Sequence, residues 1–179
     1  MADVVDLILA GHARVRRLFA VLEDAARLGE QPGAREMLSE AWARLDGLLE
    51  LHADAEEEIC YPALFGHGPH ATADIHAAIA GHDDIREAVA EARRHDVGSL
   101  AWWRAVSTAG RISGEHREVL ERGVLADFRR RADQGLRDDL GRRWAAFIAA
   151  RSRDARVRRP GPPGSRRPPA RVARSPDLR

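Results

Sequence analysis

Four long stretches of this chain repeat apolar residues at intervals of three and four, and this spacing constrains the fold more than any other feature. An α-helix has 3.6 residues per turn, so residues at such intervals form one stripe along one side of a helix. The four stretches cover residues 3–28, 33–60, 72–95 and 100–131, and segments containing glycine or proline separate them. The alternating pattern of β-strands is missing from the sequence. We therefore expect an all-α protein, an up-down-up-down four-helix bundle whose stripes face one another.

A short fifth helix and a basic tail are expected after the four long helices. Residues 136–150 place five apolar side chains where they can cover the bundle: Leu136, Leu140, Trp144, Phe147 and Ile148. Residues 151–179 contain ten arginines and two aspartates among many prolines. Because this composition cannot bury enough apolar surface to fold, we expect one domain at 1–150 and a disordered Arg/Pro-rich tail at 151–179.

The beginning of the chain and its single cysteine narrow the class of protein. Asp3 and Asp6 lie where a secretion signal would be apolar, and no apolar run is long enough to span a membrane. Cys60 alone can form neither an internal disulfide nor a thiolate cage for a metal. We therefore expect a cytoplasmic protein in which any bound metal is held by histidine and carboxylate.

Each long helix carries one histidine on its apolar stripe: His12, His52, His82 and His116. Counted from the connecting loops at about 1.5 Å per residue, His12 and His52 differ in height by roughly 3 Å, and His82 and His116 by roughly 6 Å. His52 and His82 lie at the same distance from their connecting loop to within one residue. A single histidine on such a stripe is usually an ordinary core residue. Four at one height are costly to desolvate unless they pair or bind a cation, so we expect a metal site.

Two glutamates can join this layer of histidines. Glu56 follows His52 by four residues, so both side chains project from one side of the helix and can reach one ion. Glu121 follows His116 by five and leans toward the helix interface, where its carboxylate could bridge two ions. Glu57 and Glu58 are expected to face solvent. His67, His70 and His95 are expected at the surface, and His76 can join the site only if the start of the third helix is bent.

These residues, taken together, resemble the hemerythrin-like, or HHE cation-binding, family over residues 3–131. The segments that carry the resemblance are 11–19, 52–62, 81–87 and 116–121. The family fold is a four-helix bundle around a non-haem di-iron centre, with two iron ions joined by an oxo or hydroxo bridge. The resemblance implies that Glu56 and Glu121 bridge the ions. It implies this set of metal ligands: His12, His52, Glu56, His82, His116 and Glu121.

The sequence departs from the family pattern at two positions. Oxygen carriers of the family have two histidines four apart on the third helix, whereas Ala78 and Arg86 flank His82 here. Many members have a carboxylate four residues after the last histidine, where this chain has Leu120. The site then holds two ions with an extra open position, or only one ion tightly. Zinc and manganese also suit imidazole and carboxylate ligands, so the sequence leaves the metal open.

The resemblance implies that an open iron position binds or senses dioxygen or a related small oxidant, such as peroxide or nitric oxide. Binding is favoured over catalysis, although consumption of peroxide or nitric oxide would use the same ligands. Apolar walls are expected around the site from Ile8, Val15, Ile59, Ile85 and Ile112. Two alternatives stay open: a metal-sensing regulator whose arginine-rich tail contacts polyanions, and a metal-free or zinc-binding bundle. The tail has no aromatic residue on which bases could stack, so nucleic acid is not the expected partner.

Overall fold

The computed structural model describes residues 2–27, 29, 32–68 and 70–158, and all regular structure within them is helical. The elements are α1 (Val4–Ala26), α2 (Ala34–Ala55), the π-helical turn η1 (Glu56–Cys60), α3 (Tyr61–Leu64), α4 (Ala71–Arg93), α5 (Leu100–Arg122), α6 (Val124–Arg131) and α7 (Gln134–Arg158). The predicted all-α bundle is confirmed. None of the helices in the described residues is both long and apolar enough to cross a membrane.

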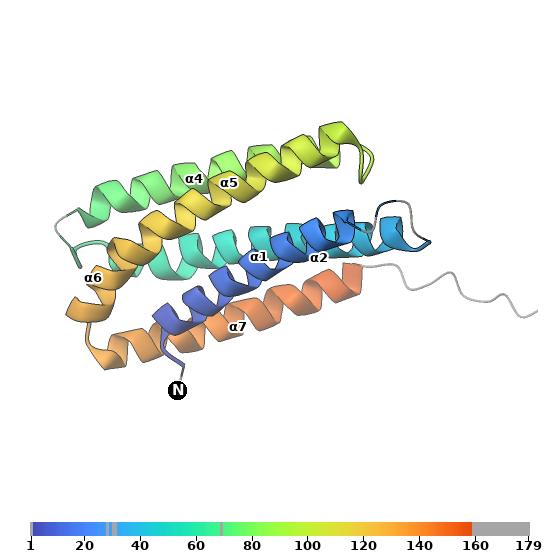
Figure 1. Ribbon diagram of the computed structural model, residues 1–179. Coiled ribbons are helices and arrows are strands. Elements are labelled where there is room, and N and C mark those ends of the chain that lie inside the picture. The colour runs from blue at the N-terminus through green and yellow to red at the C-terminus, as the bar shows by residue number, and fades with distance from the viewer. Residues whose placement is uncertain (1, 28, 30–31, 69, 159–179) are drawn as a thin grey trace, which may run out of the picture.

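The bundle consists of two antiparallel helix pairs that face each other (Figure 1). Helix α1 packs along α2, and α4 packs along α5, while α7 lies against the outer side of α1 and α2. Side chains cap α1 and α5 at their first turn. Asp3 accepts a hydrogen bond from the Val5 N–H at 2.8 Å, and Ser99 accepts one from the Trp102 N–H at 3.2 Å. Such caps satisfy backbone donors that have no partner within the helix.

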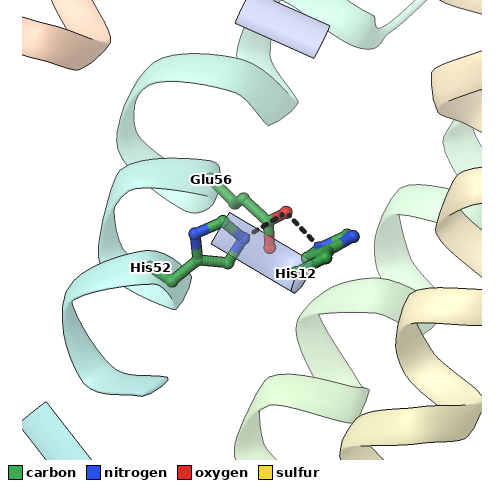
Figure 2. Close-up of side chains that lie close together, drawn as sticks. All are labelled: His12, His52 and Glu56. Atoms are coloured by element: carbon green, nitrogen blue, oxygen red, sulfur yellow. Dashed lines mark hydrogen bonds and ion pairs between the residues drawn. The ribbon is translucent and has the colours of Figure 1, made fainter. Parts of the chain in front are cut away.

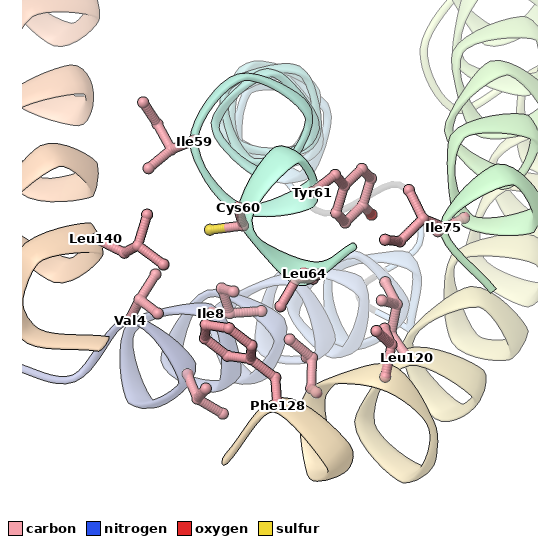
Figure 3. Close-up of a cluster of buried hydrophobic side chains, with 14 of the residues drawn as sticks. Val4, Ile8, Ile59, Cys60, Tyr61, Leu64, Ile75, Leu120, Phe128 and Leu140 are labelled. Atoms are coloured by element: carbon pink, nitrogen blue, oxygen red, sulfur yellow. The ribbon is translucent and has the colours of Figure 1, made fainter. Parts of the chain in front are cut away.

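The core is divided into two apolar clusters with buried polar side chains between them. The first surrounds Tyr61 and Phe128, with side chains from α1, η1, α4, α6 and α7 (Figure 3). The second surrounds Leu45 and Trp102 near the other end of the bundle. Along α1, the first cluster reaches Ile8 and the second begins at Val15, and the buried His12 lies between them. The polar layer is therefore flanked by apolar core on both sides.

The second predicted helix does not stay α-helical to residue 60. In η1 the Tyr61 N–H donates to the carbonyl of Glu56, five residues back instead of four. Pro62 explains the change, because it has no N–H for the carbonyl of Glu58 and its ring would collide with that carbonyl in a regular α-helix. Such π-helical turns are often found at functional sites.

The end of the fourth predicted helix and the length of the fifth also differ from expectation. A side chain at Gly123 would come within 2.8 Å of the Val119 carbonyl oxygen, and the helix breaks at this glycine into α5 and α6. Helix α7 runs to Arg158, past the predicted end at residue 150. No proline interrupts the sequence of α7, since Pro160 is the first proline after this helix begins. Past residue 150, the Arg151 guanidinium lies 5.0 Å from the centre of the Phe147 ring. Most of the predicted tail, residues 159–179, lies outside the described residues.

Candidate metal centre

Glu56 lies at the centre of the polar layer and is completely buried. Its Oε1 is 3.3 Å from Nε2 of His12 and 3.3 Å from Nε2 of His52 (Figure 2). Its Oε2 is 3.0 Å from Nε2 of His82 and 3.9 Å from Nε2 of His116. Each oxygen of one carboxylate therefore faces two imidazoles, and each imidazole pair comes from one helix pair of the bundle.

The structure brings together the four histidines that lie on the four apolar stripes. The ring centres of His12 and His52 are 5.0 Å apart, and those of His82 and His116 are 4.5 Å apart. Potential ligand atoms lie within 4.8 Å of one another in two groups, His12, His52 and Glu56, and Glu56, His82 and His116. Counting residues from the loop predicted that His82 and His116 differ in height by roughly 6 Å. Their rings nevertheless lie side by side in the structure. The donors can hold one cation in each group, with Glu56 common to both.

The outer ring nitrogens of two histidines contact further carboxylates. Nδ1 of His12 is 2.8 Å from Oε1 of Glu121, and Nδ1 of His82 is 2.6 Å from Oε1 of Glu57. A carboxylate accepts hydrogen bonds, so in the neutral imidazoles we place the proton on Nδ1, which leaves Nε2 bare toward Glu56. Nε2 of His12 and Nε2 of His82 then face the Glu56 oxygens at 3.3 and 3.0 Å, and two acceptors so close repel each other unless a proton or a cation lies between them. A carboxylate on the outer nitrogen is the usual support of a metal-binding histidine.

The electrostatics of the layer favour a cation between Glu56 and the histidines. Burial opposes ionisation of Glu56, but its electrostatic interaction with His52 and its contacts with the imidazoles of His116 and His12 outweigh burial and hold its pKa well below the usual value. Burial lowers the pKa of His116, whereas Glu56 and Glu57 overcome burial at His82 and raise its pKa. Nε2 of His52 and Nε2 of His116 have no hydrogen-bond partner in the described part of the chain. Buried polar atoms without a partner are rare, and coordination would satisfy both.

Two glycines leave the room that the imidazoles of the opposite helices need. A Cβ atom on Gly11 would lie 2.3 Å from Cε1 of His52, and one on Gly81 would lie 2.8 Å from Nδ1 of His116. Each glycine directly precedes a histidine of the layer, His12 or His82. Each Gly-His pair therefore supplies one imidazole and the space for another.

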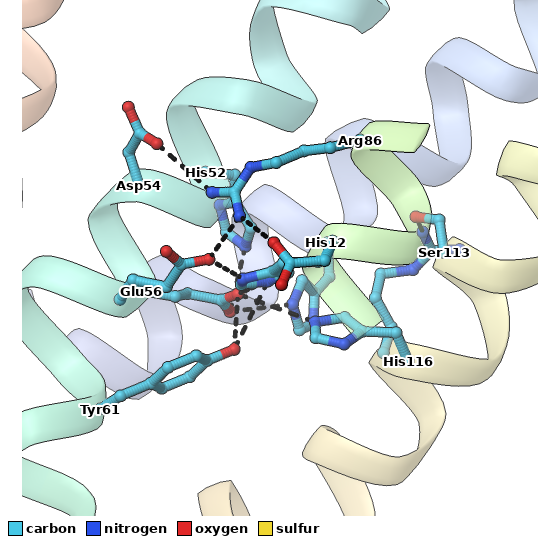
Figure 4. Close-up of polar contacts among 12 residues, drawn as sticks. His12, His52, Asp54, Glu56, Tyr61, Arg86, Ser113 and His116 are labelled. Carbon is cyan, nitrogen blue, oxygen red and sulfur yellow. Dashed lines mark hydrogen bonds and ion pairs between the residues drawn. The ribbon is translucent and has the colours of Figure 1, made fainter. Parts of the chain in front are cut away.

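Each of these Gly-His pairs is followed, four residues after the histidine, by an arginine. Nη1 of Arg16 is 3.2 Å from Oε1 of Glu121. Nη1 of Arg86, which is labelled in Figure 4, is 3.0 Å from Oε1 of Glu57. Each arginine thus holds the carboxylate that contacts the outer nitrogen of its own histidine. The sequence pattern Gly-His-x-x-x-Arg, present at 11–16 and 81–86, is the signal that could have revealed these supports.

Three further glutamates lie beside the layer: Glu57, Glu58 and Glu121. The structure places Glu121, expected to bridge two ions, on the outer nitrogen of His12 with 29% of its side chain exposed, and outside both ligand groups. The expectation that Glu57 faces solvent is wrong, because its carboxylate accepts from His82. The π-helical turn is the physical reason, since the phase of a regular α-helix no longer applies there. Glu58 is exposed, as expected.

Tyr61 is a buried residue of the site that sequence reasoning missed. Its hydroxyl donates to Oε2 of Glu56 at 3.2 Å and lies 3.4 Å from Nε2 of His82 (Figure 4). Burial, with Glu56 beside it, raises the pKa of this hydroxyl, so Tyr61 is a neutral donor to Glu56. It follows the π-helical turn, and only the changed phase of that turn brings it to the site.

The remaining histidines of the sequence lie outside the two groups. His76 is exposed and packs edge-on against Phe65, and His95 contacts Glu91 at 2.7 Å. His67 is half-buried against Phe128, and His70 is exposed.

A small cavity of about 30 Å³ adjoins the histidines and Glu56. One water needs about 10–15 Å³ of such space, so the cavity has room for about two water-sized molecules. Its apolar walls include Val15 and Ile85, as predicted, together with Leu49 and Val89. The other predicted wall residues lie in or against the apolar clusters: Ile8, Ile59 and Ile112.

A helical bundle that buries a layer of histidines around one glutamate is a metal-binding domain by its fold and donor set. The chain matches the family model of the Hemerythrin HHE cation binding domain over residues 3–111, and it belongs to this family. No curated protein and no solved structure matches it. The matched stretch contains His12, His52, Glu56 and His82. His116 lies beyond it, and its place in the layer rests on its position in the structure.

Proposed function

We propose that this protein is a non-haem di-iron protein that binds or senses dioxygen or a related small oxidant. The observation that carries the proposal is the pair of ligand groups that share Glu56. Each group offers two imidazoles and one carboxylate, the donor set typical of non-haem ferrous iron with open coordination positions. Iron bound there would supply the electrons that an oxidant accepts.

The surroundings of the groups support this function. The adjoining cavity has space for a molecule of two or three heavy atoms, and apolar side chains form much of its wall. Such apolar walls keep water scarce near the ligands. Glu57 accepts a hydrogen bond from Nδ1 of His82, and the Tyr61 hydroxyl donates one to Glu56. These two hydrogen bonds fix the orientations of His82 and Glu56.

We propose a supporting role for Glu121 in place of a bridging one. Its carboxylate lies on the outer nitrogen of His12 and is also held by Arg16. Glu121 therefore orients the imidazole as Glu57 orients His82, and Glu56 is the carboxylate shared by the two ions.

Metal analysis of the purified protein, with an absorption spectrum recorded in air, tests the proposed function. We expect two iron ions per chain and the charge-transfer absorption of a bridged ferric pair. Stoichiometric zinc, or protein without metal, would overturn the iron assignment.

A pair of histidine variants tests the ligand set. His52→Ala should remove most of the bound metal, because His52 contributes to one group and contacts the shared Glu56. His76→Ala is the control and should keep the metal, since His76 is exposed and lies in neither group. Iron retained in full by His52→Ala would show that the ligand set is wrong.

A further inference from the structure

Arg117 is a buried cation in the wall of the cavity beside the metal centre. It follows His116 on α5, and only 8% of its surface is exposed. Nη1 donates to the Ser113 hydroxyl at 2.6 Å, and Nε has no hydrogen-bond partner among the described residues (Figure 4 shows Ser113 beside His116). No described carboxylate forms an ion pair with Arg117, in contrast to Arg16 and Arg86, which each hold a glutamate.

A buried guanidinium without a counter-ion is unfavourable, and the neighbourhood of Arg117 makes it more so. Arg16 lines the same groove as Arg117, so a second positive charge lies in its neighbourhood. A serine hydroxyl or a water molecule can accept a hydrogen bond but brings no negative charge. An anion would satisfy both the orphaned Nε–H and the charge, and charge-assisted hydrogen bonds are the stronger kind.

Arg117 also lines a second space, a groove of about 400 Å³ between α1 and α5. Arg16 and Arg111 line the same groove, and Glu23 is the acidic residue in its wall. Arg16 is paired with Glu121 and Arg111 with Glu115, so Arg117 is the arginine of this groove that has no ion-pair partner among the described residues. The guanidinium of Arg117 therefore lies between this groove and the cavity at the metal centre.

Carboxylates also line the cavity: Asp46 and Glu50 on α2, and Glu56, which faces the four imidazoles. Asp46 is held by Arg93, whose Nε donates to it at 3.0 Å, and Glu50 lies 3.9 Å from the same arginine. They are already neutralised there, so they do not serve as counter-ions for Arg117.

We propose that Arg117 and Ser113 form a binding site for a small monovalent inorganic anion, separate from the metal ligands and next to them. The cavity limits the anion to a few heavy atoms, the size of bromide, nitrite or nitrate. The site requires neither iron nor an oxidant. It therefore goes beyond the proposed function and can hold when that function fails.

Bromide titration of the purified protein, followed by the line width of the ⁸¹Br resonance, tests the site in solution. We expect saturable broadening that nitrate reverses. Arg117→Gln should raise the bromide dissociation constant about tenfold or more, as loss of a charged hydrogen bond would. Arg111→Gln removes an exposed arginine of the same groove and should leave tight binding in place.

Anomalous diffraction from crystals grown in bromide locates the ion, and metal content measured in each sample separates loss of the anion from loss of metal. We expect bromide in contact with the Arg117 guanidinium in wild type and Arg111→Gln. Bromide absent there in wild type, or equal binding by Arg117→Gln, would overturn the proposal. If Arg117→Gln does not fold, Arg117→Lys keeps the charge without Nε–H and should bind bromide more weakly; unchanged affinity would contradict the site.

Discussion

His52 occupies space that only a glycine on the neighbouring helix leaves open. The nearest atom of its ring lies 2.3 Å from the point where a Cβ on Gly11 would be, much closer than two carbon atoms can approach. The backbone of α1 and the ring of His52 are therefore in direct contact. The position of one proposed ligand depends on a residue that cannot itself bind metal.

Gly11→Ala should displace the His52 ring and lower metal affinity at least roughly tenfold, as loss of a ligand's support commonly does. Elsewhere in a helix the same change stabilises by about 0.5–1 kcal/mol. Gly47→Ala in α2 is the matched control, because a Cβ there meets no atom of the described residues within 4 Å. Metal titration with a competing chelator measures both. Equal affinities in Gly11→Ala and wild type would mean that the ring has room to move.

Glu121→Gln distinguishes an orienting residue from a metal ligand. If Glu121 only holds the Nδ1 proton of His12, the variant should bind as many ions as wild type with roughly 10–100-fold lower affinity. Glu118→Gln is the control on the same helix, since Glu118 pairs with Arg122 away from the layer. Loss of one whole ion from Glu121→Gln, at saturating metal, would restore its role as a ligand.

At the scale of the elements, the apolar periodicity predicts the four long helices and the helix that covers them, because a stripe of apolar residues must be buried. It also places His12, His52, His82 and His116 on the buried side. It does not predict where a helix changes its hydrogen-bond pattern. The π-helical turn at Glu56–Cys60 is such a change, and it brings Glu57 and Tyr61 to the site.

Helix α7 supports the centre from outside through Trp144. The indole is 5% exposed, and its ring centre lies 5.3 Å from that of His52. Trp144→Ala should reduce the free energy of unfolding by about 3–5 kcal/mol, because a large cavity would remain. Leu100→Ala, at a side chain that is 68% exposed, should change it by no more than about 0.5 kcal/mol. Urea unfolding measures both, and similar values for the two variants would contradict the packing role of α7.

On the scale of the whole molecule, the polar layer interrupts a core that is otherwise apolar on both sides. Without a cation, four imidazoles and Glu56 must share protons in the interior, which is costly. Length and composition predict a single bundle of this size, but the charge balance inside the layer depends on contacts between helices far apart in sequence. The sequence therefore predicts that the histidines gather, but not which carboxylates hold them.

Removal of metal should destabilise the entire bundle. A ligand that binds only the folded state adds about 4 kcal/mol of stability at 1,000 times its dissociation constant, so a chelator should lower the melting temperature. Calorimetry with and without chelator measures the shift. Glu56→Gln is the control, because a variant that binds no ion should melt at one temperature under both conditions. An unchanged melting temperature in wild type would indicate that metal contributes nothing to the folded state.

The proposed centre requires two cations that share Glu56. An anomalous difference map from crystals of the purified protein, recorded at the iron absorption edge, tests this most directly. We predict two peaks, one between His12, His52 and Glu56, and one between Glu56, His82 and His116. A single peak, or no peak in this layer, would contradict the proposed centre.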